Sequence, residues 1–298
     1  NVTLDDVVMN YNTYFVPANA YLVIVGDVNF KEVKKEVERL FGTWKKATAP
    51  QLTYSNPKDV QYSQINFIDT PNAVQSEIAL VNLSNLKMTD KEYFSVLLAN
   101  QILGGGGEGR LFLNLREKHG WTYGAYSSIG AGKYINKFRS SASVRNTVTD
   151  SAVVEFFNEL KRIKTELVSE EDLRNAKAKY VGNFVMQIEK PSTIAGYALN
   201  KETQGLPEDF YENYIKNINA VTAKDAGDEW NVIPLIGLIK PADVNALKQL
   251  AITSPDAVVV KDAKGLPIYT AAQMLALETD DNGNFKYPIN ITRANPSS

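Results

Sequence analysis

The sequence contains no cysteine and only one histidine, His119, among its 298 residues. Without cysteine the chain can form neither disulfide bonds nor a thiolate metal site. A catalytic zinc ion usually needs three protein ligands, commonly with more than one histidine, and no carboxylate grouping in this sequence replaces them. We expect His119, between Lys118 and Gly120, to be an exposed turn residue. The sequence therefore predicts that this chain itself holds no metal ion.

Long apolar runs and a strong net charge are also missing. The longest apolar run near the start, Tyr21 to Val25, is far too short to span a bilayer, and no signal peptide opens the chain. The formal net charge is −2, which provides no general attraction to nucleic acid or to an anionic membrane. With 44% hydrophobic and 22% charged residues, the composition is that of an ordinary globular protein.

The most distinctive stretch runs from Leu103 to Ser128. Its four successive glycines, Gly104 to Gly107, would carry a large entropic cost inside a helix or strand, so they predict a loop. Before the loop, apolar residues recur at helical spacing, and Thr89 with Glu92 predicts a capping box at the start of that helix.

A second helix, a turn and a hairpin are expected after the glycines. Apolar residues from Leu111 to Leu115 continue a helical face until Gly120. Strands are predicted at Thr122 to Ile129 and at Tyr134 to Val144. Four polar residues are expected on the opposite side of the second helix: Arg110, Asn114, Glu117 and Lys118.

Two residues of this stretch are candidates for function. Arg116 near the end of the second helix and Tyr123 at the head of the next strand lie seven residues apart across the Gly120 turn. This geometry can aim a guanidinium and a phenol at one point. The alternative is that Arg116 caps the helix C-terminus and that Tyr123 is a half-buried strand aromatic. The local pattern alone favours this alternative.

The same stretch resembles the second, non-zinc half of the pitrilysin/insulinase (M16-type) family of zinc peptidases. That family has a leucine-glycine-rich loop, then R-L-F-x-x-L-R-E, then a glycine and a tyrosine. By this resemblance, Arg116 and Tyr123 assist catalysis at a substrate held at the zinc site of the other half. The family usually carries small polar residues where Glu108 and Gly109 stand. The resemblance also assigns substrate contacts to the loop residues Gly104, Gly105, Gly106 and Gly107.

The resemblance implies an α+β fold, a largely antiparallel sheet with helices packed on one face, as in a pitrilysin/insulinase-like metallopeptidase domain. Strands grouped early in the chain and helices grouped late favour the same class. The chain would bind peptide and stabilise the transition state at a zinc ion in an H-x-x-E-H half, located on the same polypeptide or on a separate subunit. It would carry no cofactor and be inactive alone. The alternative is a catalytically silent scaffold or peptide-binding protein with this fold.

A short internal sequence repeat indicates how the chain is divided into domains. The segment from Val2 to Asp6 is echoed by the segment from Val221 to Asp225, and apolar strand patterns ending at Gly26 and Gly237 follow. We expect residues 1–45 to be the closing helix, strand and helix of a preceding repeat. Residues 46–58 read as a linker, 59–250 as the second, non-zinc peptidase-like domain, and 251–298 as a tail of unknown class. We expect a periplasmic or other exported bacterial compartment, with the cytoplasm as the alternative, because a lack of cysteine fits both.

Overall fold

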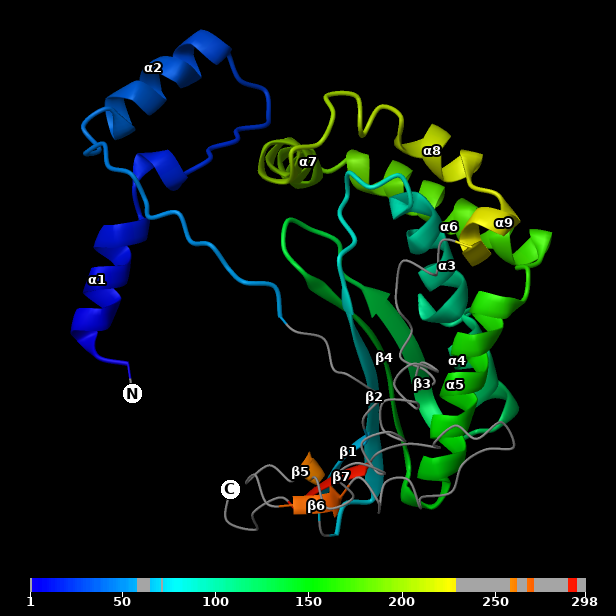
Figure 1. The fold of residues 1–298 in the computed structure, drawn as a ribbon. Helices are drawn as coiled ribbons and strands as arrows, with labels where there is room; N and C mark the ends of the chain where they lie inside the picture. Colours follow the sequence, from blue (N-terminus) through cyan, green and yellow to red (C-terminus); the bar gives the residue numbers. More distant parts are fainter. Residues whose placement is uncertain are drawn as a thin grey trace. The chain divides into compact units, whose positions relative to one another are not determined.

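The computed structural model describes residues 2–57, 65–70, 72–228, 258–261, 267–270 and 289–293. Contacts divide the chain into two compact units, residues 1–56 with 177–220, and residues 57–176 with 221–298. The first boundary between the units falls between residues 56 and 57, and residues 177–220 group with the first unit. All the candidate functional residues lie in the second unit (Figure 1).

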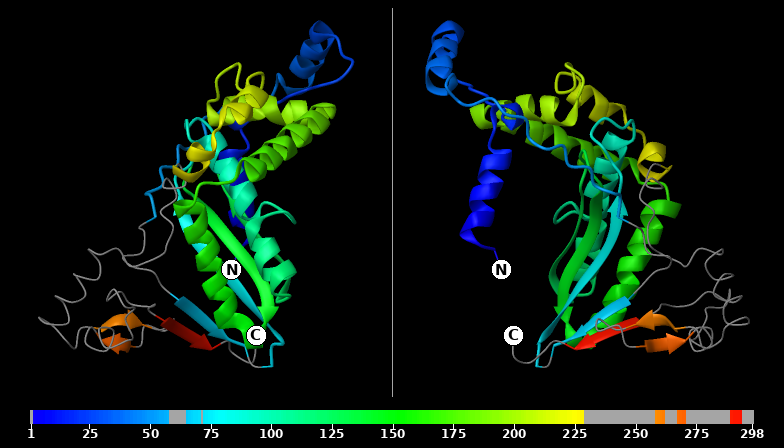
Figure 2. Two further views of the ribbon diagram at one scale, coloured as in Figure 1. Left: turned by 90° about the vertical axis from the view of Figure 1, so that its right-hand side faces the viewer. Right: turned by 60° about the vertical axis from the view of Figure 1, so that its left-hand side comes forward.

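The second unit is built on a three-stranded antiparallel sheet of order β2-β4-β3. Its strands are β2 (Gln75–Ser84), β4 (Asn136–Arg145) and β3 (Thr122–Ile129). Side chains alternate between its two faces, so that every second residue of β4 is buried: Phe138, Ser140, Ala142 and Val144. Figures 1 and 2 show α3, α4 and α5 together on one side of this sheet. The predicted α+β fold with helices on one face is confirmed.

Three helices and a π-helical turn form the covering layer. They are α3 (Tyr93–Gly104), α4 (Arg110–Phe112), the π-helical turn η2 (Leu113–Lys118) and α5 (Thr149–Thr165). Buried apolar side chains from each of them form the core with the sheet, among them Val96, Leu98, Leu103, Leu111, Leu115, Phe156 and Ile163. The short helix α9 (Ala223–Asp228) packs against α3 and α5.

The capping box predicted from Thr89 and Glu92 is not formed. Glu92 occupies the N-cap position of α3 without a side-chain hydrogen bond. The carboxylate of Asp90 instead accepts a 2.8 Å hydrogen bond from the backbone N–H of Lys87, which orders the turn before the helix. A helix that is apolar around its whole circumference is held by burial, and α3 therefore forms without this cap.

Two shorter sheets complete the second unit. Strand β1 (Ile65–Asp69) pairs in parallel with β7 (Ile289–Arg293), which is the parallel exception in a largely antiparallel arrangement. Strand β5 (Val258–Lys261) pairs antiparallel with β6 (Pro267–Thr270). The strand pattern ending at Gly237 lies outside the described residues.

The first unit is helical. It contains α1 (Leu4–Tyr14), α2 (Phe30–Phe41), most of α6 (Glu170–Ile188), α7 (Pro191–Gln204) and α8 (Tyr214–Ala220). Aromatic rings join the last three helices: Phe184 of α6 stacks on Tyr197 of α7 at 5.8 Å and on Tyr214 of α8 at 4.5 Å. No helix in the described ranges combines the length and apolar character that a membrane span requires.

The strand predicted between α1 and α2 was wrong. Residues 21–25 form irregular backbone, because a β-strand needs a hydrogen-bonding neighbour and none pairs with this segment in the described part of the chain. Helices α1 and α2 contain no buried residue. Their apolar side chains are instead exposed, for example Leu4 (77%), Met9 (62%) and Phe30 (78%).

The echoed motif has the same local structure in both places. Thr3 accepts a hydrogen bond from the Asp6 N–H, and Asp6 accepts bonds from the N–H and hydroxyl of Thr3. Thr222 and Asp225 make the same three bonds at the start of α9. Hydrogen bonding to Thr3 lowers the pKa of the Asp6 carboxyl. Both copies of the motif are therefore capping boxes.

Candidate functional site

The glycine run begins inside the core. Gly104 is the last residue of α3, not a loop residue, and it is buried against β3. A Cβ atom at Gly104 would lie 2.6 Å from the backbone nitrogen of Ser127, closer than any side chain tolerates. Gly105 and Gly106 are half-buried and Gly107 is exposed. The first glycine thus lets α3 approach the sheet, and the loop surface becomes accessible toward Gly107.

The π-helical turn that follows the loop is held by a buried polar cluster. The side-chain amide of Asn114 donates hydrogen bonds to Glu155, at 2.7 Å, and to Glu159, at 2.8 Å. Asn114 and Glu159 are both buried, and Arg162 lies 3.7 Å from the second Glu159 oxygen. We expected Asn114 on the polar outer face of a regular helix. The wider π turn instead rotates it toward α5, because two carboxylates there need donors.

Arg110 is also buried, contrary to the expected outer position. Its Nη2 atom lies 3.5 Å from a carboxylate oxygen of Asp172 at the start of α6. This ion pair links the start of α4 to α6. Asp172 itself belongs to a conventional helix start, because its N–H donates a 3.0 Å hydrogen bond to the Ser169 hydroxyl.

Arg116 lies on the exposed side of the same π turn. Its guanidinium carbon sits 4.7 Å from the centroid of the Phe112 ring, in a cation–π arrangement. Its Nε atom is 3.5 Å from Glu117, and its side chain is 43% exposed. The backbone carbonyl of Arg116 accepts a 2.8 Å hydrogen bond from Gly120. Arg116 is therefore fixed at its base while its guanidinium remains accessible to a ligand.

The turn between Arg116 and Tyr123 contains the single histidine. Gly120 has φ +63°, a left-handed conformation that favours glycine. His119 is half-buried and stacks on Trp121, with ring centroids 4.1 Å apart and planes inclined by 20°. Its Nε2 atom is buried and has no hydrogen-bond partner in the described residues. His119 lies in the turn as predicted, but the prediction that it is exposed was wrong, because the adjacent indole offers the imidazole a flat apolar partner.

Tyr123 lies in a β-bulge at the start of β3. Thr122 pairs with Val144 and Ala125 pairs with Ala142, so β3 carries one extra residue over this interval. The hydroxyl of Thr122 stabilises the bulge with bonds to the carbonyl and N–H of Gly124, at 3.0 and 3.2 Å. The Tyr123 side chain is 89% exposed. The alternative of a half-buried strand aromatic is therefore excluded for this residue.

Tyr126 belongs to the same surface, and the sequence analysis missed it. Its ring centroid lies 5.9 Å from that of Phe112, the ring that also holds Arg116. The ring also lies over Gly124, where a Cβ atom would meet it at 2.6 Å. No hydrogen bond joins Arg116 to Tyr123 in the described part of the chain. Contacts lead from Arg116 through Phe112 to Tyr126, whose ring lies over Gly124, the residue after Tyr123. Phe112 lies four residues before Arg116, so the sequence could have indicated that the Phe112 ring lies beneath the guanidinium.

A metal site is not part of this surface. In the described ranges no group of three histidine, cysteine, aspartate or glutamate side chains is arranged to hold a metal ion. The helix α3 is lined by apolar side chains such as Val96 and Leu98. The residues present do not fit a zinc ion.

Residues 1–180 match the family model described as "Peptidase M16 inactive domain". The chain belongs to this family. The matched range includes the glycine run and the segment from Arg116 to Tyr123.

Relatives in sequence agree with the assignment. This M16 domain is 23% identical over 225 residues to a "Probable inactive metalloprotease YmfF" of Bacillus subtilis, with 76% of this chain and 52% of that protein covered. It is 30% identical over 174 residues to an "Uncharacterized zinc protease" of Rickettsia bellii, covering 58% of this chain and 40% of that protein. The chain therefore spans about half the length of these relatives, or less.

Solved structures share the fold. A protease from Helicobacter pylori matches with a TM-score of 0.71 and 20% identity, over 79% of this chain and 57% of that one. The M16 inactive domain from Pseudomonas fluorescens matches with a TM-score of 0.67 and 21% identity, over 77% of this chain and 54% of that one. At these identities the similarity establishes the fold alone.

Proposed function

We propose that this M16 domain is the non-zinc half of a zinc-dependent endopeptidase. It binds a peptide and helps to stabilise the transition state at a zinc ion held by an H-x-x-E-H half, on the same polypeptide or on a separate subunit. One observation carries the proposal: a phenol and a guanidinium from the family segment, on either side of the Gly120 turn, are both accessible to a ligand. Tyr123 is 89% exposed, and Arg116 lies over Phe112 with 43% of its side chain exposed.

The two side chains have distinct chemical roles in this proposal. The Tyr123 hydroxyl donates a hydrogen bond to the developing oxyanion of the scissile peptide bond or to the adjacent backbone. The Arg116 guanidinium binds a substrate carbonyl or carboxylate, and its charge makes that hydrogen bond stronger than one from a neutral donor. The zinc-bearing half supplies the metal chemistry, because no cluster among the described residues fits a zinc ion. Of the four glycines expected to contact substrate, Gly105, Gly106 and Gly107 lie in the loop, and the loop offers substrate contacts toward its exposed end at Gly107.

The first 45 residues contribute to association in this proposal. Helices α1 and α2 bury none of their residues, and large apolar side chains such as Leu4, Met9 and Phe30 are exposed. Apolar surface of this extent marks a protein contact. We assign that contact to the zinc-bearing half, so that residues 1–45 close a preceding repeat, residues 46–58 link it to the second domain, and 251–298 follow as a tail.

Cleavage of an unstructured peptide in the presence of zinc tests the proposal. The full chain alone should not cleave it, whereas the chain mixed with a candidate H-x-x-E-H half should. Tyr123→Phe and Arg116→Ala should each lower kcat in the mixture by about tenfold to a thousandfold, the range seen for single transition-state donors. Lys118→Ala, an exposed cation in the same turn, is the matched control and should retain full turnover.

Two results would contradict the proposal. Cleavage by the chain alone would show that it holds a metal site of its own. Unchanged turnover in both Tyr123→Phe and Arg116→Ala, with association of the halves demonstrated by sedimentation, would remove these residues from the mechanism.

A catalytically silent scaffold or peptide-binding protein is the second candidate. The name of the Bacillus subtilis relative, "Probable inactive metalloprotease YmfF", favours this second candidate. This alternative predicts that the halves associate without any gain in cleavage. An exported compartment stays a prediction from the lack of cysteine, and fractionation of cells expressing the natural gene tests it.

A further inference from the structure

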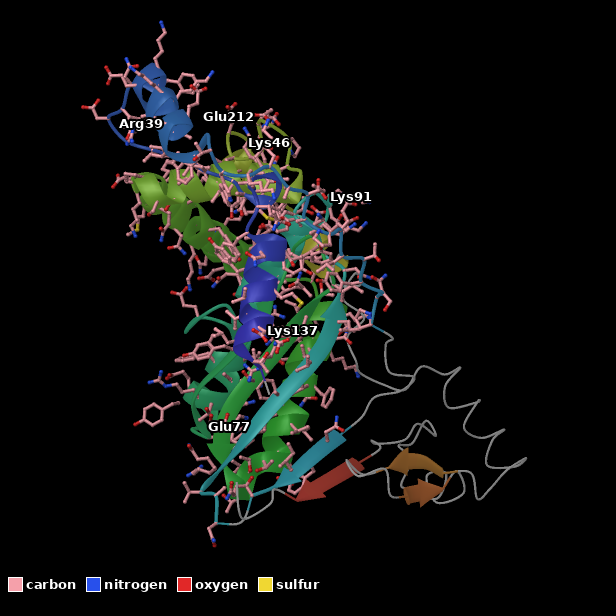
Figure 3. All side chains as sticks on the ribbon, turned by 90° about the vertical axis from the view of Figure 1, so that its left-hand side faces the viewer. Arg39, Lys46, Glu77, Lys91, Lys137 and Glu212 are labelled. Atoms are coloured by element: carbon pink, nitrogen blue, oxygen red, sulfur yellow. The ribbon has the colours of Figure 1, made fainter. Side chains whose placement is uncertain are left out.

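The sheet of the second unit has a second face that carries charge. Helices α3, α4 and α5 cover one face of β2-β4-β3, and the side chains of alternate residues project from the other. On β4 this open face carries three exposed cations, Lys137, Arg139 and Arg145, which we name the basic row. Figure 3 shows Lys137 on this sheet, viewed from the left-hand side of Figure 1.

The basic row has no neutralising partner in the described part of the chain. No carboxylate there forms an ion pair with any of its three members. Glu77 is the single acid on this face of the three strands, and its carboxylate accepts a hydrogen bond from the Ser143 hydroxyl. Like charges two residues apart on one strand repel each other, so an anion would stabilise the row.

The row is continuous with the candidate site. Arg139 Nη1 donates a 2.7 Å hydrogen bond to the Ser141 hydroxyl, which directs the guanidinium along β4. Ser141 pairs with Tyr126 across β3, and Ser128 pairs with Arg139. The basic row therefore begins beside Tyr126, the ring that connects Arg116 to the bulge at Tyr123.

Apolar side chains of β2 lie directly across from the cations. Val81, which is 43% exposed, pairs with Arg139, and Leu83 pairs with Lys137. An extended peptide presents side chains with the same two-residue period as a strand. An extended peptide that carries acidic residues at every second position would present them all toward this face, at the spacing that separates Lys137 from Arg139.

We propose that the basic row and the neighbouring apolar residues of β2 bind acidic extended peptide segments, and that they select such substrates. This inference rests on the proposed function, because it names the substrate class of that same surface. Nucleic acid is the less favoured anion, because the net charge of the chain is −2 and polyanion binding depends on a broad basic surface.

Fluorescence anisotropy with the full chain tests the inference directly. One labelled peptide carries Glu and Val alternately, and a second carries Lys in place of every Glu. The acidic peptide should bind tenfold or more tightly than the basic one, about the effect of several exposed ion pairs. Raising the salt concentration from about 0.1 M to about 1 M should reduce the difference, because the Debye length shrinks from roughly 10 Å to 3 Å.

Matched variants test whether the basic row causes the preference for the acidic peptide. The triple variant Lys137→Ala, Arg139→Ala and Arg145→Ala should lose the preference for the acidic peptide. A control triple removes the same charge from exposed positions on the helices α5 and α6: Lys161→Ala, Lys164→Ala and Arg174→Ala. This control should keep the preference, which separates local contact from a net-charge effect.

Three results would overturn the inference: equal binding of the two peptides, equal losses in both triple variants, or tighter binding of a single-stranded oligonucleotide than of the acidic peptide. Its failure is distinguishable from failure of the proposed function, because the binding measurement uses no zinc-bearing half. A mixture that cleaves peptides and depends on Tyr123, with no preference for acidic sequences, would retain the proposed function alone.

Discussion

The guanidinium carbon of Arg116 lies 4.7 Å from the centroid of the Phe112 ring, and the same ring lies 5.9 Å from Tyr126. Phe112 is 8% exposed and packs in the core, so it connects a fixed interior to two surface side chains. A cation held over an aromatic ring gains about 0.5 to 1 kcal/mol at an exposed site and keeps a restricted orientation. Phe112 is thus a positioning residue for Arg116.

Phe112→Leu should lower turnover of the assembled peptidase more than its effect on stability explains. The leucine keeps the site apolar, so we expect a loss of about 1 to 2 kcal/mol in the free energy of unfolding. Phe138→Leu, at a phenylalanine that is 1% exposed in β4, is the matched control. Urea denaturation and peptide turnover are measured for both, and an equal fall in turnover would rule out a positioning role.

Gly104→Ala and Gly107→Ala should differ in their cost to stability, because Gly104 packs against the sheet and Gly107 is exposed. The Gly104 Cβ atom would lie 2.6 Å from the Ser127 nitrogen, so alanine should cost about 1 to 3 kcal/mol of stability. At Gly107 the nearest atoms of Phe112 are 3.8 Å away, and the stability should change by less than about 0.5 kcal/mol. Urea midpoints check both, and comparable losses at the two positions would contradict the packing difference.

Asn114→Ala should destabilise the π turn, because it leaves the Glu159 oxygen buried without the donor that lies 2.8 Å away. An unsatisfied buried group costs about 1 to 3 kcal/mol. Asn158→Ala is the matched control, since exposed Asn158 also donates to Glu155, at 3.1 Å. Its effect should stay within about 0.5 kcal/mol. The same urea midpoint for both variants would show that the Asn114 cluster contributes no stability.

Stability should fall in alkaline solution because of Tyr180. Burial raises the pKa of its phenol to about 12. An unfolded tyrosine titrates near pH 10, so above that pH the unfolded state releases a proton that the folded state retains. The free energy of unfolding should be unaffected below about pH 10 and should fall by roughly 1 to 3 kcal/mol by about pH 12.

Tyr180→Phe removes this titration and should flatten the pH dependence over that window. Urea midpoints from circular dichroism, measured from about pH 9 to about pH 12, give the slope for both proteins. If the urea midpoint fell with pH equally steeply in Tyr180→Phe and in the unmodified protein, groups other than Tyr180 would cause the alkaline destabilisation.

The sequence predicted those features that depend on neighbouring residues. The span of β3 agrees with the prediction, and the two echoed segments at Thr3 and Thr222 adopt the same local structure. A two-residue apolar period and turn residues are local signals, so they can be read without the fold, although the capping box predicted at Thr89 did not form. The family pattern also located Arg116 and Tyr123, whose catalytic roles and substrate contacts stay predictions.

Tertiary structure decided which side chains face inward and which patterns become elements. The strand pattern at residues 21–25 found no partner, and Asn114 turned inward because α5 presents two carboxylates. The bulge that exposes Tyr123 depends on the register against β4, which no local pattern encodes. The basic row likewise forms one surface with Tyr126 only because β3 and β4 pair in that register. Sequence alone therefore fixed the local elements of this M16 domain, while strand pairing and burial decided which residues its surface offers to a peptide.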